Sequence, residues 1–137
     1  IMNKRMLHSF HKKAQPYVYA GVRILVGILF FLFGAMKFGY FGASEPVSLW
    51  SIFWFAGIIE VAVGLSLVAG FFVRPMTGIA AIEMLVAFFC THFPLGWNPI
   101  LNNGVAALLL FALFILFHIH GAGQWSIDGL LKKETKQ

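Results

Sequence analysis

The chain has 137 residues, of which 60% are hydrophobic and 11% are charged, and its formal net charge at pH 7 is +5. Ordinary soluble domains have about 25% charged residues, and a chain this short cannot bury so much apolar surface in a core of its own. The composition therefore argues against a soluble globular enzyme, a disordered tail and a disulfide scaffold. It predicts an integral membrane protein of one domain.

Cysteine usage and the placement of charge exclude further classes of protein. The single Cys90 excludes an intrachain disulfide, a C-x-x-C redox motif, a thiolate-bound iron–sulfur cluster and a C-x-x-C-H haem attachment. The basic residues gather towards the chain ends while the middle is apolar. This pattern fits the cytoplasmic ends of a membrane protein better than a nucleic-acid partner.

Residues 1–16 are predicted to form a basic amphipathic segment on an anionic membrane surface. Met2, Met6 and Phe10 recur at helical spacing among basic residues, which is typical of an interfacial helix. We expect this helix to end near Pro16, because proline removes a backbone hydrogen bond. A frayed basic tail is the alternative interpretation.

Four apolar segments follow, and each is long enough to cross a hydrocarbon core of ~30 Å, which takes about 20 helical residues. The first also resembles a secretory signal, but it is long for one and no A-x-A cleavage site follows it. Short turns rich in proline, glycine or asparagine separate the segments, which favours an all-α, up-down-up-down four-helix transmembrane bundle. The expected spans are residues 17–39, 49–73, 75–93 and 100–120, which make up a transmembrane domain over 17–120.

Lysine and arginine predict the orientation of the bundle. With the N-terminus in the cytoplasm, eight of the ten basic residues lie inside, as the positive-inside rule requires. We therefore expect both termini to be cytoplasmic, with residues 121–137 forming a tail that ends in a short amphipathic helix. The predicted location is the inner, cytoplasmic membrane, as a multi-pass protein in contact with the lipid bilayer.

Three ionisable residues lie within the predicted spans: Arg23, Glu60 and Glu83. Such residues are rare at membrane depth and by default mark a functional site. Each lies on a helix face of small residues, and such faces pack against other helices in lipid. We therefore expect Arg23 to pair with Glu60 and Glu83 inside the bundle. The cluster either fixes the helix register or forms a proton-linked or ligand-binding pocket, with the two glutamates as its catalytic groups.

Lys37 and His92 are expected near the outer ends of the first and third spans. There they would meet an anionic or carbonyl ligand, or they are simply snorkelling end residues. The histidines fit no metal or bis-histidine haem pattern, because His92 and His118 are separated by most of the membrane. His118 and His120 are two residues apart and point to different helix faces. We therefore expect no haem, iron–sulfur or metal site.

Several motifs, in the order in which they follow one another along the chain, resemble those of a known family. From Arg23 the first span reads R-I-L-V-G-I-L-F-F-L-F-G-A-M-K-F, and from Gly57 the second reads G-I-I-E-V-A-V-G-L-S-L-V-A-G-F-F-V-R-P. Residues 121–128 read G-A-G-Q-W-S-I-D. Together these motifs resemble the DoxX family of small four-helix membrane proteins, over about residues 17–130. Ala122 departs from the family pattern, which is close to G-P-G-x-x-S-[LI]-D.

The resemblance implies a function as well as a fold. The chain is similar to the DoxD and DoxA subunits of a thiosulfate:quinone oxidoreductase, which implies a quinone-interacting or accessory subunit of a membrane oxidoreductase. Other protein subunits would be its partners. The family pattern covers Arg23, Lys37, Glu60, Arg74 and His92, which would line a polar interior or loops. Arg23, Lys37 and His92 would then contact a quinone, and Glu60 and Glu83 would relay protons. The alternative is a non-catalytic membrane anchor or assembly subunit.

Overall fold

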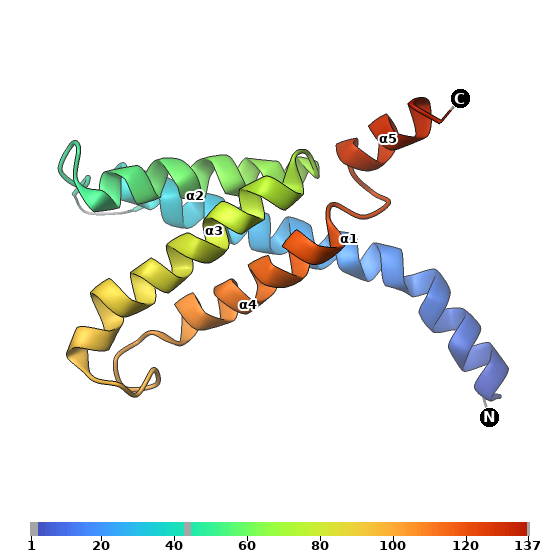
Figure 1. Cartoon of the computed structure of the whole chain (residues 1–137), viewed down its shortest axis with the longest axis horizontal. Coiled ribbons are helices and arrows are strands. Elements are labelled where there is room, and N and C mark those ends of the chain that lie inside the picture. Colours follow the sequence, from blue (N-terminus) through green and yellow to red (C-terminus); the bar gives the residue numbers. More distant parts are fainter. Residues whose placement is uncertain (1–2, 43–44, 137) are drawn as a thin grey trace.

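The computed structural model describes residues 3–42 and 45–136, and within these ranges it contains helices and no strand. The prediction of an all-α chain is confirmed. A π-helix and a 3₁₀ turn extend the third α-helix. In chain order the elements are α1 (Lys4–Lys37), α2 (Ile52–Ala69), α3 (Val73–Ala87), η1 (Phe88–His92), η2 (Phe93–Leu95), α4 (Val105–His120) and α5 (Ile127–Glu134) (Figure 1).

Three helical segments among the described residues are long and apolar enough to cross a membrane: α1, α2 and the stretch Val73–Leu95. The helix α4 is apolar but has 16 residues, or about 24 Å at 1.5 Å per residue, which is less than the ~30 Å hydrocarbon core. It begins later than expected because the preceding loop folds around Asn102. The Asn102 side chain accepts a hydrogen bond from the Gly104 N–H and donates one to the Gly96 carbonyl.

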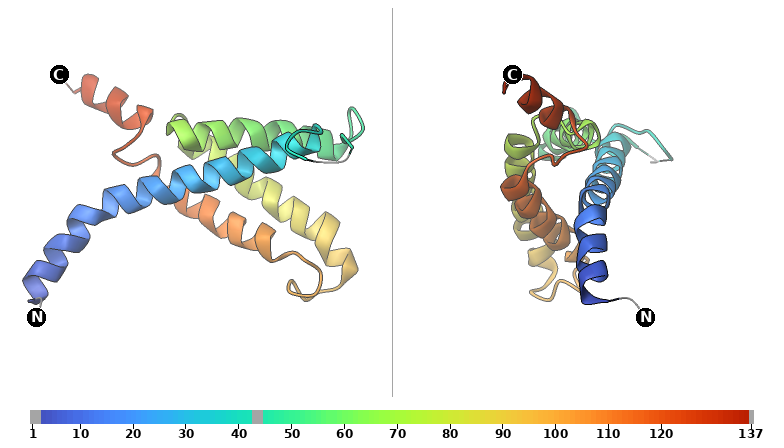
Figure 2. Two further views of the ribbon diagram at one scale, coloured as in Figure 1. Left: turned by 180° about the vertical axis from the view of Figure 1, so that it is seen from behind. Right: turned by 90° about the vertical axis from the view of Figure 1, so that its right-hand side faces the viewer.

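The expected helix end at Pro16 is wrong, because α1 continues through this residue to Lys37. The axis of α1 bends in its N-terminal part, which extends away from the other helices (Figure 2). A proline inside a helix removes one hydrogen bond and clashes with the carbonyl four residues earlier, which bends the helix without ending it. The protruding turns expose Met6 and Phe10.

The helices α1 and α2 pack against each other through glycines. A Cβ atom at Gly27 would lie 2.9 Å from the Gly64 oxygen, and one at Gly34 would lie 2.7 Å from the Gly57 oxygen. Small residues allow two helix backbones to approach this closely. The predicted small-residue packing faces of α1 and α2 are therefore confirmed.

The helices α3 and α4 form a second pair, and the two pairs diverge from each other. They meet near the α2–α3 connection and separate towards the opposite end of the molecule (Figures 1 and 2). Phe30 of α1 and Phe114 of α4 join the pairs, with both rings fully buried and their centroids 4.7 Å apart. The divergence opens a space between α2 and α3, where the candidate site lies.

Candidate functional site

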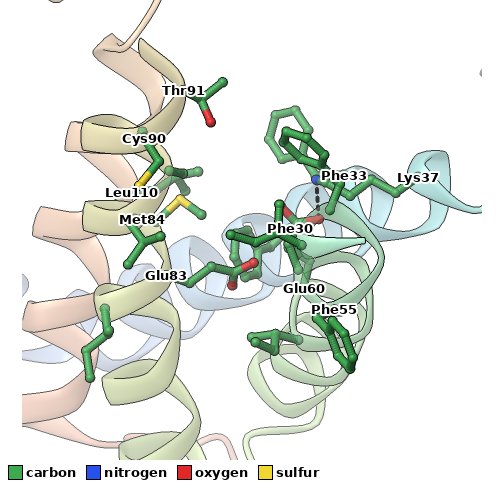
Figure 3. A pocket seen from close by; sticks show the side chains of 18 of the residues that line it. Phe30, Phe33, Lys37, Phe55, Glu60, Glu83, Met84, Cys90, Thr91 and Leu110 are labelled. Carbon is green, nitrogen blue, oxygen red and sulfur yellow. Dashed lines mark hydrogen bonds and ion pairs between the residues drawn. The ribbon is translucent and has the colours of Figure 1, made fainter. Parts of the chain in front are cut away.

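The candidate site is a pocket of about 620 Å³ between α2 and α3. Its walls are mostly apolar, and Figure 3 shows Phe55 on one side and Met84 on the other. Strongly exposed apolar residues such as Ile52 and Ile82 also line it, so the pocket opens at the outer surface of the molecule. Its polar lining consists of Lys37, Glu60, Glu83, Thr91 and His92.

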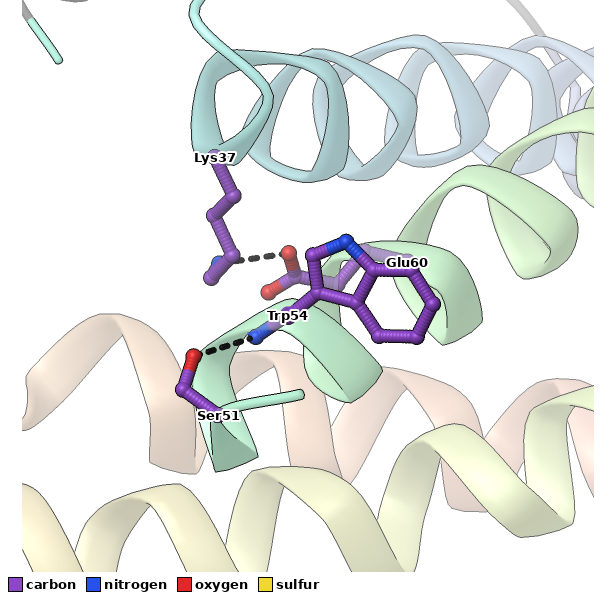
Figure 4. A network of polar contacts seen from close by, with 4 residues as sticks. All are labelled: Lys37, Ser51, Trp54 and Glu60. Atoms are coloured by element: carbon purple, nitrogen blue, oxygen red, sulfur yellow. Dashed lines mark hydrogen bonds and ion pairs between the residues drawn. The ribbon is translucent and has the colours of Figure 1, made fainter. Parts of the chain in front are cut away.

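Lys37 and Glu60 form an ion pair at one wall of the pocket. The Nζ atom of Lys37 lies 2.5 Å from Oε2 of Glu60, and Glu60 is 5% exposed (Figure 4). The pair follows from the close packing of the α1 and α2 glycines, which we call the glycine contact. A Cβ atom at Gly34 would lie 2.9 Å from the Cβ of Glu60, and Lys37 lies three residues later on the same face of α1. The Ser51 side chain caps α2 nearby by accepting a hydrogen bond from the Trp54 N–H.

Glu83 enters the pocket from α3 and points towards Glu60 (Figure 3). Both of its carboxyl oxygens are buried, and neither has a hydrogen-bond partner among the residues that the structure describes. Burying a polar group without a partner costs free energy. Glu83 therefore offers the pocket an acceptor or a proton that its described neighbours do not use.

The π-helix η1 brings Cys90, Thr91 and His92 to the pocket wall. A π-turn widens the helix, and such segments are frequent at functional sites. One ring nitrogen of His92 lies 3.0 Å from the carbonyl oxygen of Asn102, so the loop before α4 holds the imidazole in place. No sequence pattern predicted this π-helix.

Arg23 lies outside the pocket, and its expected pairing with Glu60 and Glu83 is wrong. The structure pairs Lys37 with Glu60 instead, and Arg23 is absent from the described lining of the pocket. Of the five predicted site residues, the structure brings four together: Lys37, Glu60, Glu83 and His92.

Arg23 instead binds main-chain oxygens at the opposite end of the helix pairs. Its guanidinium is 1% exposed and donates to the carbonyls of Leu67 at 2.9 Å, of Trp125 at 2.6 Å and of Ala122. Arg23 binds these carbonyl groups because the segment after α4 folds back over α1 and α2. Its carbonyl oxygens reach the guanidinium, which has five N–H donors. We call these contacts the tail clamp.

Further hydrogen bonds attach residues 121–128 to the rest of the chain. The Tyr19 hydroxyl donates to the Gly121 carbonyl at 2.5 Å. The Asp128 carboxylate accepts from the N–H groups of Phe72 and Val73 at 3.0 and 3.3 Å, at the start of α3. Sequence reasoning missed this docking. The sequence feature that could have revealed the docking is the G-A-G-Q-W-S-I-D motif. Its serine caps α5, and its aspartate caps α3.

The described residues contain no group of three or more His, Cys, Asp or Glu side chains placed to hold a metal ion. The chain is similar to known proteins in two comparisons. The model of the DoxX family matches residues 19–93, which include all four residues brought together in the pocket. A Haemophilus influenzae protein described as uncharacterized is 34% identical over 135 residues, covering 90% of this chain and 97% of that protein. No solved structure matches the chain.

Proposed function

This chain belongs to the DoxX family of membrane proteins, and from that premise we propose that it is a quinone-interacting accessory subunit of a membrane oxidoreductase of the thiosulfate and quinone type. One observation carries the proposal. A single, mostly apolar pocket gathers two carboxyl groups, an ammonium group and an imidazole. An apolar cavity with a few convergent polar groups is the usual form of a small-molecule site.

The pocket suits a ring that carries an apolar tail. Sites for small molecules typically measure about 300–1,000 Å³, and this pocket measures about 620 Å³. Exposed Ile52 and Ile82 form part of its mouth between the diverging helices. A prenyl tail can therefore extend from the pocket into the bilayer.

Each polar residue of the pocket has a role in this proposal. Lys37 and His92 would donate hydrogen bonds to ring oxygens, and Glu83 and Glu60 would hold and transfer protons. A bound quinone supplies the electron-accepting chemistry, and the electrons would come from a partner subunit or from thiosulfate. Arg23 has no part in the binding, because carbonyl oxygens of the tail clamp occupy its guanidinium.

For the topology we propose four membrane spans with both termini cytoplasmic, in the inner membrane. Both termini and the α2–α3 connection lie towards the same end of the molecule (Figure 1). Eight of the ten basic residues belong to these segments, which supports placing that end in the cytoplasm.

A non-catalytic anchor or assembly subunit is the second candidate function. The Lys37–Glu60 ion pair and the tail clamp favour it, because each of them also joins elements of the fold. Buried polar contacts of this kind can specify how helices pack without taking part in chemistry.

Purification of the tagged chain with its native partners separates the two functions. We expect mass spectrometry to find about one quinone per chain. Glu60→Gln and Glu83→Gln should assemble normally while quinone-dependent turnover of the complex falls at least tenfold, since proton-transfer groups contribute about 10²–10⁴-fold. Glu45→Gln is the matched control, because Glu45 is exposed and lies outside the described pocket lining.

The anchor function would replace the proposal under either of two results. One is a stoichiometric partner subunit with no quinone. The other is normal turnover in both single variants and in the double variant, each correctly assembled.

A further inference from the structure

We propose that a second hollow, at the end of the molecule where the tail docks, binds the phosphate group of an anionic phospholipid. The hollow measures about 440 Å³. Three parts of the chain build it: the start of α3, the residues that follow α4, and α5. Among the described residues, none lines both this hollow and the pocket between α2 and α3.

Two cations line this hollow from different elements, Arg74 from α3 and Lys132 from α5. Neither forms an ion pair with a carboxylate within residues 3–42 and 45–136. A guanidinium binds phosphate oxygens in a forked geometry, and an ammonium group adds a flexible point charge. The pair therefore offers charge-assisted hydrogen bonds to one phosphate group.

The one carboxylate in the hollow does not cancel both of these charges. Asp128 also lines it, but its oxygens accept hydrogen bonds from the N–H groups of Phe72 and Val73. Asp128 is thereby bound to the N-terminus of α3, where a negative charge is favourable. With Arg74 and Lys132 opposed by one carboxylate, the hollow has an excess of positive charge.

Gly121 allows Arg74 to reach across the hollow. This glycine has a φ of +78°, and a Cβ atom there would lie 3.0 Å from Nε of Arg74. Any larger residue would be strained and would displace the guanidinium. The backbone of Arg74 is held as well, because its carbonyl oxygen lies 2.8 Å from Nδ1 of His118.

Exposed aromatic residues favour a lipid over a soluble phosphate. Phe72 lines the hollow, and its ring centroid lies 6.0 Å from that of Phe71. Trp125 follows the lining residue Gly123 by two positions. Phe71, Phe72 and Trp125 are 48%, 58% and 58% exposed. Exposed aromatic rings beside basic residues are typical of the membrane–water interface. Basic hollows between helices at this level bind the headgroups of anionic lipids.

Native mass spectrometry of the delipidated full chain in detergent tests this proposal, with dioleoylphosphatidylglycerol as the probe. We expect preferential binding of this lipid over dioleoylphosphatidylcholine, and no competition from inorganic phosphate. Arg74→Gln and Lys132→Gln should each weaken the binding about fivefold, the effect of one basic residue near an anionic headgroup. Lys133→Gln is the matched control, because Lys133 is the next residue of α5 and does not line the described hollow.

Three results would overturn the proposal. An equal loss of binding in Lys133→Gln would show general surface attraction, and equal binding of the two lipids would remove the preference for an anionic headgroup. Competition by inorganic phosphate would replace the lipid with a soluble anion. Lys132 is exposed on α5, so its variant keeps the fold even if Arg74→Gln unfolds. The quinone content of these variants should not change, which separates this test from that of the proposed function.

Discussion

At the scale of single residues, Arg23 lies inside the helices with main-chain oxygens as its hydrogen-bond partners. Three carbonyl groups from α2 and from the segment after α4 accept its N–H groups. A buried charge is tolerated when its hydrogen-bonding capacity is used in this way. The guanidinium thus joins α1 to two parts of the chain that are distant in sequence.

Replacement of Arg23 tests the tail clamp. Arg23→Gln should lower the free energy of unfolding by about 3 kcal/mol, because hydrogen bonds to charged groups contribute about 1.5–3 kcal/mol each and their carbonyl partners stay buried. It should also make the chain after His120 sensitive to protease. Denaturant unfolding in detergent, followed by circular dichroism, measures the first effect, and limited proteolysis measures the second.

Lys13→Gln is the control for this prediction, because it removes an exposed cation from the same helix. Arg23→Lys should give an intermediate loss of stability, since an ammonium group lacks the planar fork that reaches several carbonyls. An Arg23→Gln variant as stable and as protease-resistant as the Lys13→Gln variant would contradict the clamp.

Much of the pocket could be predicted from the sequence at this scale. Glu60 and Glu83 stand out because charges within apolar spans face the protein interior, and the structure brings both into one pocket. The partner of Glu60 could not be predicted, because Lys37 was expected at the outer end of its span. The partners of Arg23 could not be predicted either. They are carbonyl groups, which carry no sequence signal, and two of the three lie on a segment about a hundred residues away.

At the scale of helices, the glycine contact sets the distance between α1 and α2. A Cβ atom at Gly64 would lie 2.6 Å from the Phe31 nitrogen and 2.7 Å from the Gly27 oxygen. Both are backbone atoms, so no side-chain movement relieves the overlap. The Lys37–Glu60 ion pair depends on the same close approach.

Two alanine substitutions compare this contact with an open surface. Gly64→Ala should destabilise the protein by about 1–3 kcal/mol, because added volume in a packed contact forces the helices apart. Gly21→Ala should be neutral or stabilising by up to about 1 kcal/mol, since alanine is the better helix former and nothing lies within 4 Å of a Cβ atom there. Denaturant unfolding in detergent measures both variants, and equal effects would refute the glycine contact.

The length of the hydrophobic segments and the spacing of small residues predicted the central parts of the helices, but not all of the positions at which the helices begin and end. The α1–α2 contact follows from glycines spaced seven residues apart on each helix. Pro16 was expected to end a helix, yet the turns on both sides of it remain helical. The start of α4 depends on hydrogen bonds made by Asn102 across its loop, which a local pattern does not reveal.

At the scale of the whole molecule, the two helix pairs diverge from a shared end that carries most of the positive charge. Both chain termini lie towards that end (Figure 2). The bilayer would then hold the pocket mouth in its hydrocarbon region and the basic residues at one surface. This arrangement makes the orientation of the chain a direct test of the proposed topology.

Reporter fusions test this orientation. Alkaline phosphatase, which is active only outside the cytoplasm, should be inactive when fused after Lys136 and active when inserted after Trp97, in the loop before α4. Green fluorescent protein, fused at the first position, should fluoresce in the cytoplasm. Active phosphatase after Lys136 would contradict both cytoplasmic termini and the four-span topology.

The tail clamp also bears on how this chain tolerates substitution. Arg23 recognises the carbonyl oxygens of Ala122 and Trp125, and every amino acid carries such an oxygen, proline included. A substitution at either position therefore leaves the hydrogen bonds of the guanidinium unchanged as long as the backbone conformation of the loop is kept. A proline at 122 would keep this acceptor, so by this reasoning the exchange of alanine and proline there leaves the clamp intact. Insertion or deletion of one residue in the loop would instead move these oxygens away from the guanidinium.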